Sequence, residues 1–234
     1  MYAPVYPHDE LTNLYPGVYL LHGSIRMGPG MRMNRNMIVL DNEGELILIN
    51  PVRMTEEGLT RLEEMGKVKV VLRLGDFHGL DDQFYVDRYQ CAFWAQDGQT
   101  TYKQPLPDRL IAAATPSPFP NSHFFIFEDA AYPEAALFLN EHQLLITTDS
   151  VQYHADWSYF SPFTKFAFKL LGFKPGINIG PPWLKRVTSK GCSLKSDFDR
   201  MLSLDFDAIV GAHDLHMRSG AKDALNAAVR RVFG

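Results

Sequence analysis

The feature that most constrains the fold is an apolar, β-branched run, Val68–Leu74, that ends abruptly in acidic residues and a histidine. Such a run predicts a buried strand, and an α/β fold usually builds its site at the carboxyl ends of its strands. Two later segments, Leu144–Asp149 and Phe206–His213, repeat the design. The side chains of the metal-ligand type at these three strand ends are Asp76, His78, Asp81, Asp149 and His213. We therefore expect the three strand ends to build a site.

The composition is that of an ordinary globular protein. The 234 residues are 46% hydrophobic and 21% charged, with a net charge of −4, and a chain of this length can bury a sizeable core. No cluster of lysine and arginine indicates a nucleic-acid surface, and no glycine-rich fingerprint indicates a nucleotide cofactor. No apolar run reaches the roughly 20 residues of a membrane span. We therefore expect no nucleic-acid partner, no membrane partner and no nucleotide cofactor.

The cysteines and the first residues bear on location. Cys91 and Cys192 are too few and too scattered for a disulfide framework, which favours free thiols in a reducing compartment. The first residues lack a basic stretch followed by an apolar one, so we expect no secretory signal. Together these observations predict a cytoplasmic protein.

Strand and helix patterns alternate along the chain. Thr55 is suited to cap a helix that extends to about Met65, and the Gly- and Met-rich residues 23–35 are expected to form a loop or a hairpin connection. The other expected strands are 17–22, 36–40, 46–50, 124–127, 135–139, 144–148 and 208–210, and the other expected helices are 162–171, 196–204 and 221–232. The two halves, each with strands first and a helix later, predict a sandwich of two sheets with helices outside.

The order of these segments resembles that of the metallo-β-lactamase fold superfamily. The main metal motif of that family, His-x-His-x-Asp-His after a strand, is matched in spacing by Asp76–Asp81, in which His78 keeps its residue type. Thr148-Asp149 is similar to the family's Gly-Asp position, and Gly211–His213 is similar to the segment with its last histidine. The resemblance covers about Gly17 to Val232. It implies an α+β fold, an αββα sandwich of two mixed β-sheets packed face to face with helices on the outside.

The same resemblance implies a single domain over residues 1–234, in which Tyr153–Lys190 is an insertion or a lid. The densest aromatic segment, Trp157–Phe168, lies within it. Its pattern fits a helix packed over the sheets, and it also fits a lid or subunit contact that lines an apolar substrate pocket.

Departures from the family motifs limit the metal site that the resemblance implies. Asp76 and Asp81 replace histidines, Leu80 replaces the usual aspartate, and Ala131 stands where a ligating histidine is expected. A full dinuclear zinc site is therefore not expected. One divalent ion, zinc, iron or manganese, suits the donors that remain, with Asp81 or Asp76 as a further ligand or general base. The residues retained as metal ligands are His78, Asp149 and His213.

Two functions remain open at this point. The first is a metal-dependent hydrolase with an altered, mononuclear site, acting on an ester, amide, thioester or phosphodiester of a small-molecule substrate. The second is a catalytically inactive member of the same fold that serves as a binding or dimerisation module, with a homodimer as one form. All three retained ligands, and Asp81 with Asp82, also have a purely structural alternative. Asp81 and Asp82 are suited to cap a following helix, Asp149 to cap a turn, and His78 and His213 to hydrogen-bonded or anchoring positions in loops.

Overall fold

The computed structural model describes residues 2–213 and 215–234. Its strands are β1 (His8–Tyr15), β2 (Val18–Gly28), β3 (Met31–Asn42), β4 (Glu45–Ile49), β5 (Lys67–Arg73), β6 (Ala92–Ala95), β7 (Arg109–Leu110), β8 (Ser122–Ile126), β9 (Ala135–Leu139), β10 (Leu144–Ile146), β11 (Val151–His154), β12 (Gly176–Ile179), β13 (Ala208–Val210) and β14 (His216–Met217). Its helices are α1 (Glu56–Met65), α2 (Asp82–Tyr89), α3 (Pro162–Leu170), α4 (Pro181–Val187), α5 (Lys195–Leu202) and α6 (Ala221–Phe233).

Most strands form two mixed sheets. The larger sheet has the order β1-β2-β3-β4-β5-β6-β7, antiparallel from β1 to β4 and parallel from β4 to β7. The smaller sheet has the order β14-β13-β10-β9-β8, in which only β10 and β13 pair in parallel. A separate ribbon pairs β11 with β12. The expected pair of mixed sheets is confirmed.

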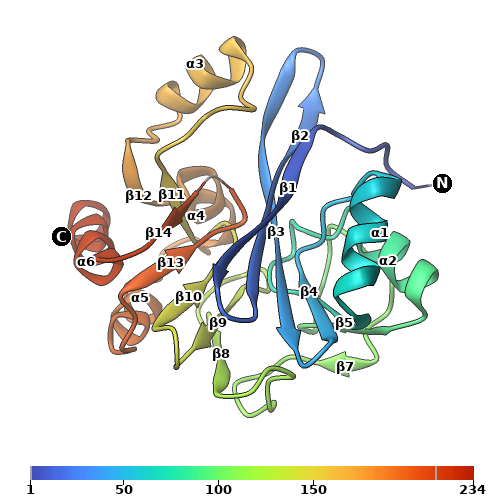
Figure 1. Cartoon of the computed structure of the whole chain (residues 1–234). Coiled ribbons are helices and arrows are strands. Elements are labelled where there is room, and N and C mark those ends of the chain that lie inside the picture. Colours follow the sequence, from blue (N-terminus) through green and yellow to red (C-terminus); the bar gives the residue numbers. More distant parts are fainter. Residues whose placement is uncertain (1, 214) are drawn as a thin grey trace.

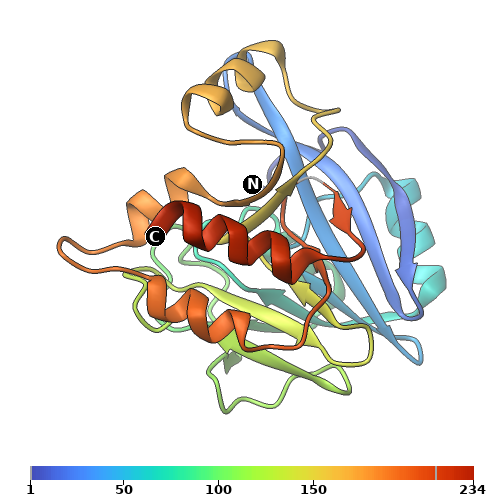
Figure 2. The ribbon, with the colours of Figure 1, turned by 90° about the vertical axis from the view of Figure 1, so that its left-hand side faces the viewer.

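The two sheets lie between layers of helices. In Figure 1, α1 and α2 lie on the outer side of the larger sheet, and α5 and α6 lie beyond the smaller sheet. Figure 2 shows α6 and α5 running across the outer face of the smaller sheet. One hydrophobic cluster fills the space between the sheets, and two others lie under the helices on either side. This is the αββα sandwich that the resemblance implied.

The central strands explain why hydrophobic runs rather than alternating patterns mark this core. In β3, Ile38 and Leu40 belong to the cluster between the sheets, whereas Met37 and Val39 belong to the cluster under α1 and α2. A strand that is covered on both faces reads as a continuous apolar run. The cap predicted at Thr55 is confirmed, since its side chain accepts a hydrogen bond from the Gly58 backbone N–H at 3.2 Å.

The expectation for residues 23–35 is correct as a hairpin and wrong as a loop. Strands β2 and β3 continue through this segment with pairs from Gly23↔Arg35 to Gly28↔Met31. The strand pattern is hidden there because Ser24, Asn34 and Arg35 are polar yet buried, so no alternation of apolar and polar residues marks the strands. The polar stretch lies beside the candidate site.

The segment Tyr153–Lys190 contains part of β11 together with α3, β12 and α4. Helix α3 lies beside the far end of the β2–β3 hairpin in both Figure 1 and Figure 2, and the Ser161 hydroxyl donates to the Gly30 carbonyl. That this segment moves as a lid stays a prediction. Among the described residues, no helix is both long and apolar enough to cross a membrane.

Candidate functional site

Three strand ends deliver three potential metal ligands to one point. His78 follows β5 in the larger sheet, and Asp149 and His213 follow the parallel neighbours β10 and β13 in the smaller sheet. The two sheets meet here, because the Ala135 N–H donates to the Leu74 carbonyl at 2.7 Å. The ligand atoms of His78, Asp149 and His213 all lie within 4.8 Å of one another. We call these three residues the His–Asp–His cluster.

Asp149 lies at the centre of the cluster. One carboxylate oxygen is 3.1 Å from His78 Nε2 and the other is 3.0 Å from His213 Nε2. Burial acts to raise the pKa of Asp149, but the two imidazoles outweigh it through charge and hydrogen bonding and hold the pKa well below its usual range. Burial also lowers the pKa of His78, against the opposing charge of Asp149. The electrostatics of the cluster therefore favour the ionised form of Asp149.

The tautomer of His213 is set by the hydrogen bond at its Nδ1 atom. His213 Nδ1 lies 2.8 Å from the Asn34 carbonyl oxygen, which can only accept, so Nδ1 carries a proton. A neutral His213 then directs the lone pair of Nε2 at an Asp149 oxygen 3.0 Å away, and two lone pairs repel at that distance. The geometry calls for a cation between them, either a proton on Nε2 or a metal ion.

A chain of hydrogen bonds orients Asp149 from the other side. The Trp157 indole N–H donates to His154 Nδ1 at 3.1 Å, so His154 Nε2 is the nitrogen that donates to Gln152 Oε1, at 2.9 Å. The Gln152 amide nitrogen in turn donates to Asp149 Oδ1 at 3.1 Å. His154, the remaining histidine near Asp149 in sequence, thus acts on the carboxylate through Gln152.

Neither Asp81 nor Asp76 belongs to the cluster. Asp81 is buried, and its Oδ2 accepts from Arg35 Nη1 at 2.7 Å and from the Arg53 backbone N–H at 3.3 Å. Asp76 is buried too, and its carboxylate accepts hydrogen bonds from the backbone N–H and hydroxyl groups of Thr100 and Thr101 at 2.5–3.2 Å. That either residue acts in catalysis stays a prediction, and both have structural partners.

The sequence suggested that Asp81 and Asp82 cap a helix. Asp81 does occupy the capping position, but neither side chain supplies the cap. Asp81 is the residue before α2, but its side chain makes no capping hydrogen bond. Asp82 is the first residue of the helix, and its carboxylate accepts from Arg73 Nε at 2.6 Å, with both side chains fully buried. The two carboxylates therefore hold arginines of β3 and β5 rather than helix N–H groups.

Glu134 is a site residue that the sequence reasoning missed. Its buried carboxyl accepts from the Thr148 hydroxyl and from the Ser150 backbone N–H, the two neighbours of Asp149. Burial, together with the nearby charge of Asp149, raises the pKa of Glu134 to about 8. Glu134 lies three residues after Ala131, the position at which the family resemblance implied a ligating histidine. The signal available in the sequence was a glutamate directly before the apolar strand run Ala135–Leu139.

The cluster lies in a cavity of about 490 Å³. The polar part of its wall contains the cluster together with Arg35 and Gln152, and Arg186 is also in the wall. Arg186 is stacked over the rings of Phe77 and Tyr132, with its guanidinium carbon 4.8 Å and 5.3 Å from their centroids. The remainder is mainly apolar: Ile25, Met27, Met31, Met33, Phe77, Leu80, Phe168, Leu171, Phe173, Pro182 and Trp183. An apolar cavity with a few converging polar groups is the usual form of a small-molecule site.

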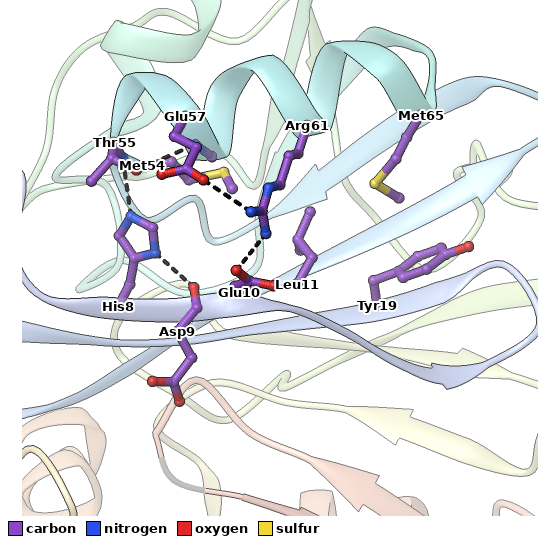
Figure 3. Close-up of a pocket in the computed structure, with 11 residues that line it drawn as sticks. His8, Asp9, Glu10, Leu11, Tyr19, Met54, Thr55, Glu57, Arg61 and Met65 are labelled. Atoms are coloured by element: carbon purple, nitrogen blue, oxygen red, sulfur yellow. Dashed lines mark hydrogen bonds and ion pairs between the residues drawn. The ribbon is translucent and has the colours of Figure 1, made fainter.

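A second cavity, of about 540 Å³, lies between β1 and α1 and differs in chemistry (Figure 3). Three of its charged groups are paired with one another: Arg61 bridges Glu10 and Glu57 at 2.5 Å and 2.9 Å. His8 Nε2 accepts from the Thr55 backbone N–H at 3.0 Å, at the start of α1. These side chains fasten β1 to the helix, so we assign the candidate site to the first cavity.

Comparisons with known proteins support the fold. No family model and no curated protein sequence matches the chain. Among solved structures, it is similar to VMB-1 at pH 5.5 (TM-score 0.71, 11% identity, 99% of this chain and 100% of that one). It is also similar to the metallo-β-lactamase FIM-1 from Pseudomonas aeruginosa in the mono-zinc form (0.69, 8%, 97% of each). A third is a metallo-β-lactamase from Pontibacter korlensis (0.67, 14%, 94% and 98%). The chain therefore has the metallo-β-lactamase fold.

The residues present fit one metal ion of the kind that this fold implies. Ligand atoms around a tetrahedral zinc with bonds of about 2.1 Å lie roughly 3.4 Å apart. Here one ligand atom from each residue lies within 4.8 Å of the others, and the shortest separations, 3.0 Å and 3.1 Å, join the imidazoles to the two different oxygens of Asp149. Three protein ligands leave a fourth position open, as in catalytic zinc sites. The Asn34 carbonyl holds His213 in the tautomer that presents Nε2, which is the usual outer contact of a ligating histidine.

Proposed function

We propose that this protein is a metal-dependent hydrolase with a mononuclear site in which His78, Asp149 and His213 hold one divalent ion. The observation that carries the proposal is the arrangement of His213, whose protonated Nδ1 leaves Nε2 facing the ionised Asp149 at 3.0 Å. The mono-zinc form of FIM-1 among the similar structures supports a single ion. Zinc suits two imidazoles and a carboxylate, and iron and manganese remain alternatives.

The chain's own groups define what each side of the site does. Gln152 and Glu134 fix the loop that carries Asp149, while Asp81 holds the Arg35 guanidinium in the cavity wall. When bound, a divalent ion supplies a water of near-neutral pKa and polarises a carbonyl or phosphoryl oxygen. Arg35 is the cation best placed in the wall to attract a developing negative charge.

The cavity wall indicates the kind of substrate. Apolar side chains form most of it, including methionines of β2 and β3 and aromatic residues of α3 and α4, and the exposed Arg186 adds a positive charge. We propose an ester, amide, thioester or phosphodiester with an apolar body, held so that its polar bond reaches the cluster. A cytoplasmic location and a homodimer stay predictions.

The alternative is a metal-free binding module. It is favoured by the ion pair of Arg35 with Asp81, at the position compared above with the last histidine of the family's main motif. In this case the cation required between His213 and Asp149 is a proton, and the cavity binds its ligand without hydrolysis.

Metal titration distinguishes the two functions. The full chain, stripped with a chelator and dialysed against zinc, should retain about one equivalent by elemental analysis. His78→Ala, Asp149→Ala and His213→Ala should each bind zinc about 100-fold more weakly or worse, since even outer contacts are worth about 10–100-fold. His123→Ala, at an exposed histidine packed on Phe138, is the matched control. Wild-type zinc retention in all three cluster variants would contradict the metal site.

Activity is tested separately on the zinc-loaded protein. A panel of chromogenic esters, thioesters, amides and phosphodiesters with short and long apolar groups should show turnover that His78→Ala and His213→Ala abolish. Stoichiometric zinc without turnover on any class would support a binding module that retains its metal.

A further inference from the structure

The largest exposed apolar side chains gather at one end of the molecule. Phe163, Phe166 and Leu170 of α3 are 60%, 61% and 72% exposed, and Leu171 and Met27 beside them are also exposed. Met27 belongs to the far end of the β2–β3 hairpin, which projects together with α3 at the top of Figures 1 and 2. We call residues 25–33 and 161–174 the apolar tip. Contiguous exposed apolar surface of this kind marks an interaction site.

Helix α3 does not need these side chains for its own packing. Ser161 caps it by accepting from the Thr164 N–H, and Phe168 packs with Met33, Phe160 and Phe173 on the inner side. Phe163, Phe166 and Leu170 follow the i, i+3, i+7 spacing of one helix face, and that face is exposed. The helix is thus apolar on its outer side as well, which the fold of this chain does not explain.

The charges on the apolar tip all have one sign. Its two segments contain Arg26, Arg32, Lys165, Lys169 and Lys174 and no aspartate or glutamate. The whole chain carries −4, so the remaining residues carry −9 against +5 on the tip. Arg26 and Arg32 donate to the backbone oxygens of Gly28 and Tyr159, and no ion pair neutralises any of the five among residues 2–213 and 215–234. The occupant of this surface should therefore be negatively charged.

A second copy of the chain does not fit this requirement. A symmetric dimer brings the same patch of both subunits together, and here it would set two tips of +5 against each other. Like charges that face one another across an interface oppose association. Exposed aromatic and leucine side chains among lysines and arginines are instead the pattern of a surface that lies on a membrane.

We propose that the apolar tip docks on the surface of a bilayer that contains anionic lipids. Phe163, Phe166 and Leu170 enter the interface, and the five basic side chains contact the headgroups. The sequence argued against a membrane partner because no segment can span a bilayer, but surface docking needs none. Met27 and Leu171 also line the cavity above the His–Asp–His cluster, so docking turns the cavity toward the lipid. The inference does not depend on the proposed hydrolase.

Flotation of the full chain with lipid vesicles tests the inference. The protein should float with vesicles of phosphatidylcholine and phosphatidylglycerol and remain unbound with phosphatidylcholine alone. Binding should fall as salt is raised, because the Debye length shrinks from about 10 Å at 0.1 M to about 3 Å at 1 M. Absence of flotation with the anionic vesicles, or equal flotation with both compositions, would overturn the proposal.

Matched variants locate the surface. Leu170→Asp should weaken binding to the anionic vesicles about tenfold or more, whereas Leu106→Asp, at a side chain that is 71% exposed in the segment before β7, should not. Lys169→Glu should weaken it by about tenfold or more, on the basis of roughly 1 kcal/mol per basic residue near the surface, and Lys67→Glu should not. Unchanged melting temperatures confirm that all four variants fold. Equal losses in the control variants, or a wild-type dimer that Leu170→Asp dissociates in light scattering, would overturn the proposal.

Discussion

The carboxylates after β5 and the carboxylate after β10 have the same chemistry but different partners. Asp81 and Asp82 are buried against the guanidinium groups of Arg35 and Arg73, at 2.7 Å and 2.6 Å. Asp149 is held between two imidazoles that come from two different sheets. A guanidinium is always protonated and fills its site permanently, whereas an imidazole offers a lone pair or a proton.

The two kinds of partner differ in whether the cation can be exchanged: the guanidinium groups are fixed parts of the chain, whereas the cation at Asp149 is exchangeable. At Asp81 and Asp82 the positive charge is part of the chain, and its removal would leave a buried carboxylate without a partner. At Asp149 the cation has to be supplied from solution, as a proton or as a metal ion, so this carboxylate is available for chemistry. The comparison predicts that the first group of carboxylates, Asp81 and Asp82 with their arginines, governs stability. The second group, Asp149 with its two imidazoles, is predicted to govern metal affinity.

The largest expected effect is at the first group. Arg73→Met leaves Asp82 buried without its partner and should lower the free energy of unfolding by about 3–5 kcal/mol, measured by urea denaturation. Burial already raises the pKa of Asp82 to about 6, against the effect of Arg73, and removing the guanidinium raises it further. A raised carboxyl pKa gives stability that is present at low pH and is lost as the pH rises. The loss should therefore be greater at pH 8 than at pH 5.

Two controls accompany this variant. Arg73→Met combined with Asp82→Leu should recover much of the loss, because no uncompensated charge then remains. Arg88→Met, at a partly exposed pair with Glu63, should cost less than about 1 kcal/mol. An equally small loss for Arg73→Met would show that the buried pair does not govern stability.

Glu134 gives the next largest effect, on pH dependence in the metal-free protein. Its folded pKa of about 8 lies above the ordinary 4.5, so its contribution to stability is complete below pH 4.5 and is lost as the pH rises through 8. Glu134→Gln imitates the protonated form and lacks this loss. Relative to wild type, the variant should gain about 3–4 kcal/mol of unfolding free energy between pH 5 and pH 8. Parallel pH profiles for the two proteins would contradict the raised pKa.

Much of the fold and the metal ligands could be predicted because their signals are local. Apolar runs such as Val68–Leu74 identify strands, and His78, Asp149 and His213 each follow a strand within a few residues. Parallel or facing strand ends then bring such residues together without further information. The cluster itself was therefore within reach of the sequence.

The partners of the acidic residues could not be predicted, because they are distant in sequence. Arg35 is 46 residues from Asp81, and no local pattern connects them. The carboxylates of Asp76, Asp81 and Asp149 look alike in sequence, although only Asp149 meets two histidines. One signal was available: Arg35 and Arg73 interrupt otherwise buried strands, and a buried arginine requires an anionic partner.

A variant of Gln152 tests how strongly zinc binding at Asp149 depends on the side chains that orient its carboxylate. Gln152→Leu removes the amide that links Asp149 to His154 and should weaken zinc binding by about 10–100-fold, measured by competition with a chromogenic chelator. Gln143→Leu, at an exposed amide that contacts Asp205, is the control. Unaltered zinc affinity in Gln152→Leu would show that the imidazoles alone orient the carboxylate.

The smallest expected effect is at Asp76. Burial acts to raise the pKa of Asp76, but hydrogen bonds from Thr101 and Thr100 outweigh it and lower the pKa, so its contribution to stability is lost as the pH falls. Asp76→Asn keeps one acceptor and should cost about 1 kcal/mol of unfolding free energy at neutral pH, with zinc affinity and turnover close to wild type. A general base would instead cost about 10²–10⁴-fold in turnover. Such a loss with unchanged zinc content would show that Asp76 takes part in the reaction. Asp76 would then belong with Asp149 among the carboxylates available for chemistry, rather than with the structural pair Asp81 and Asp82.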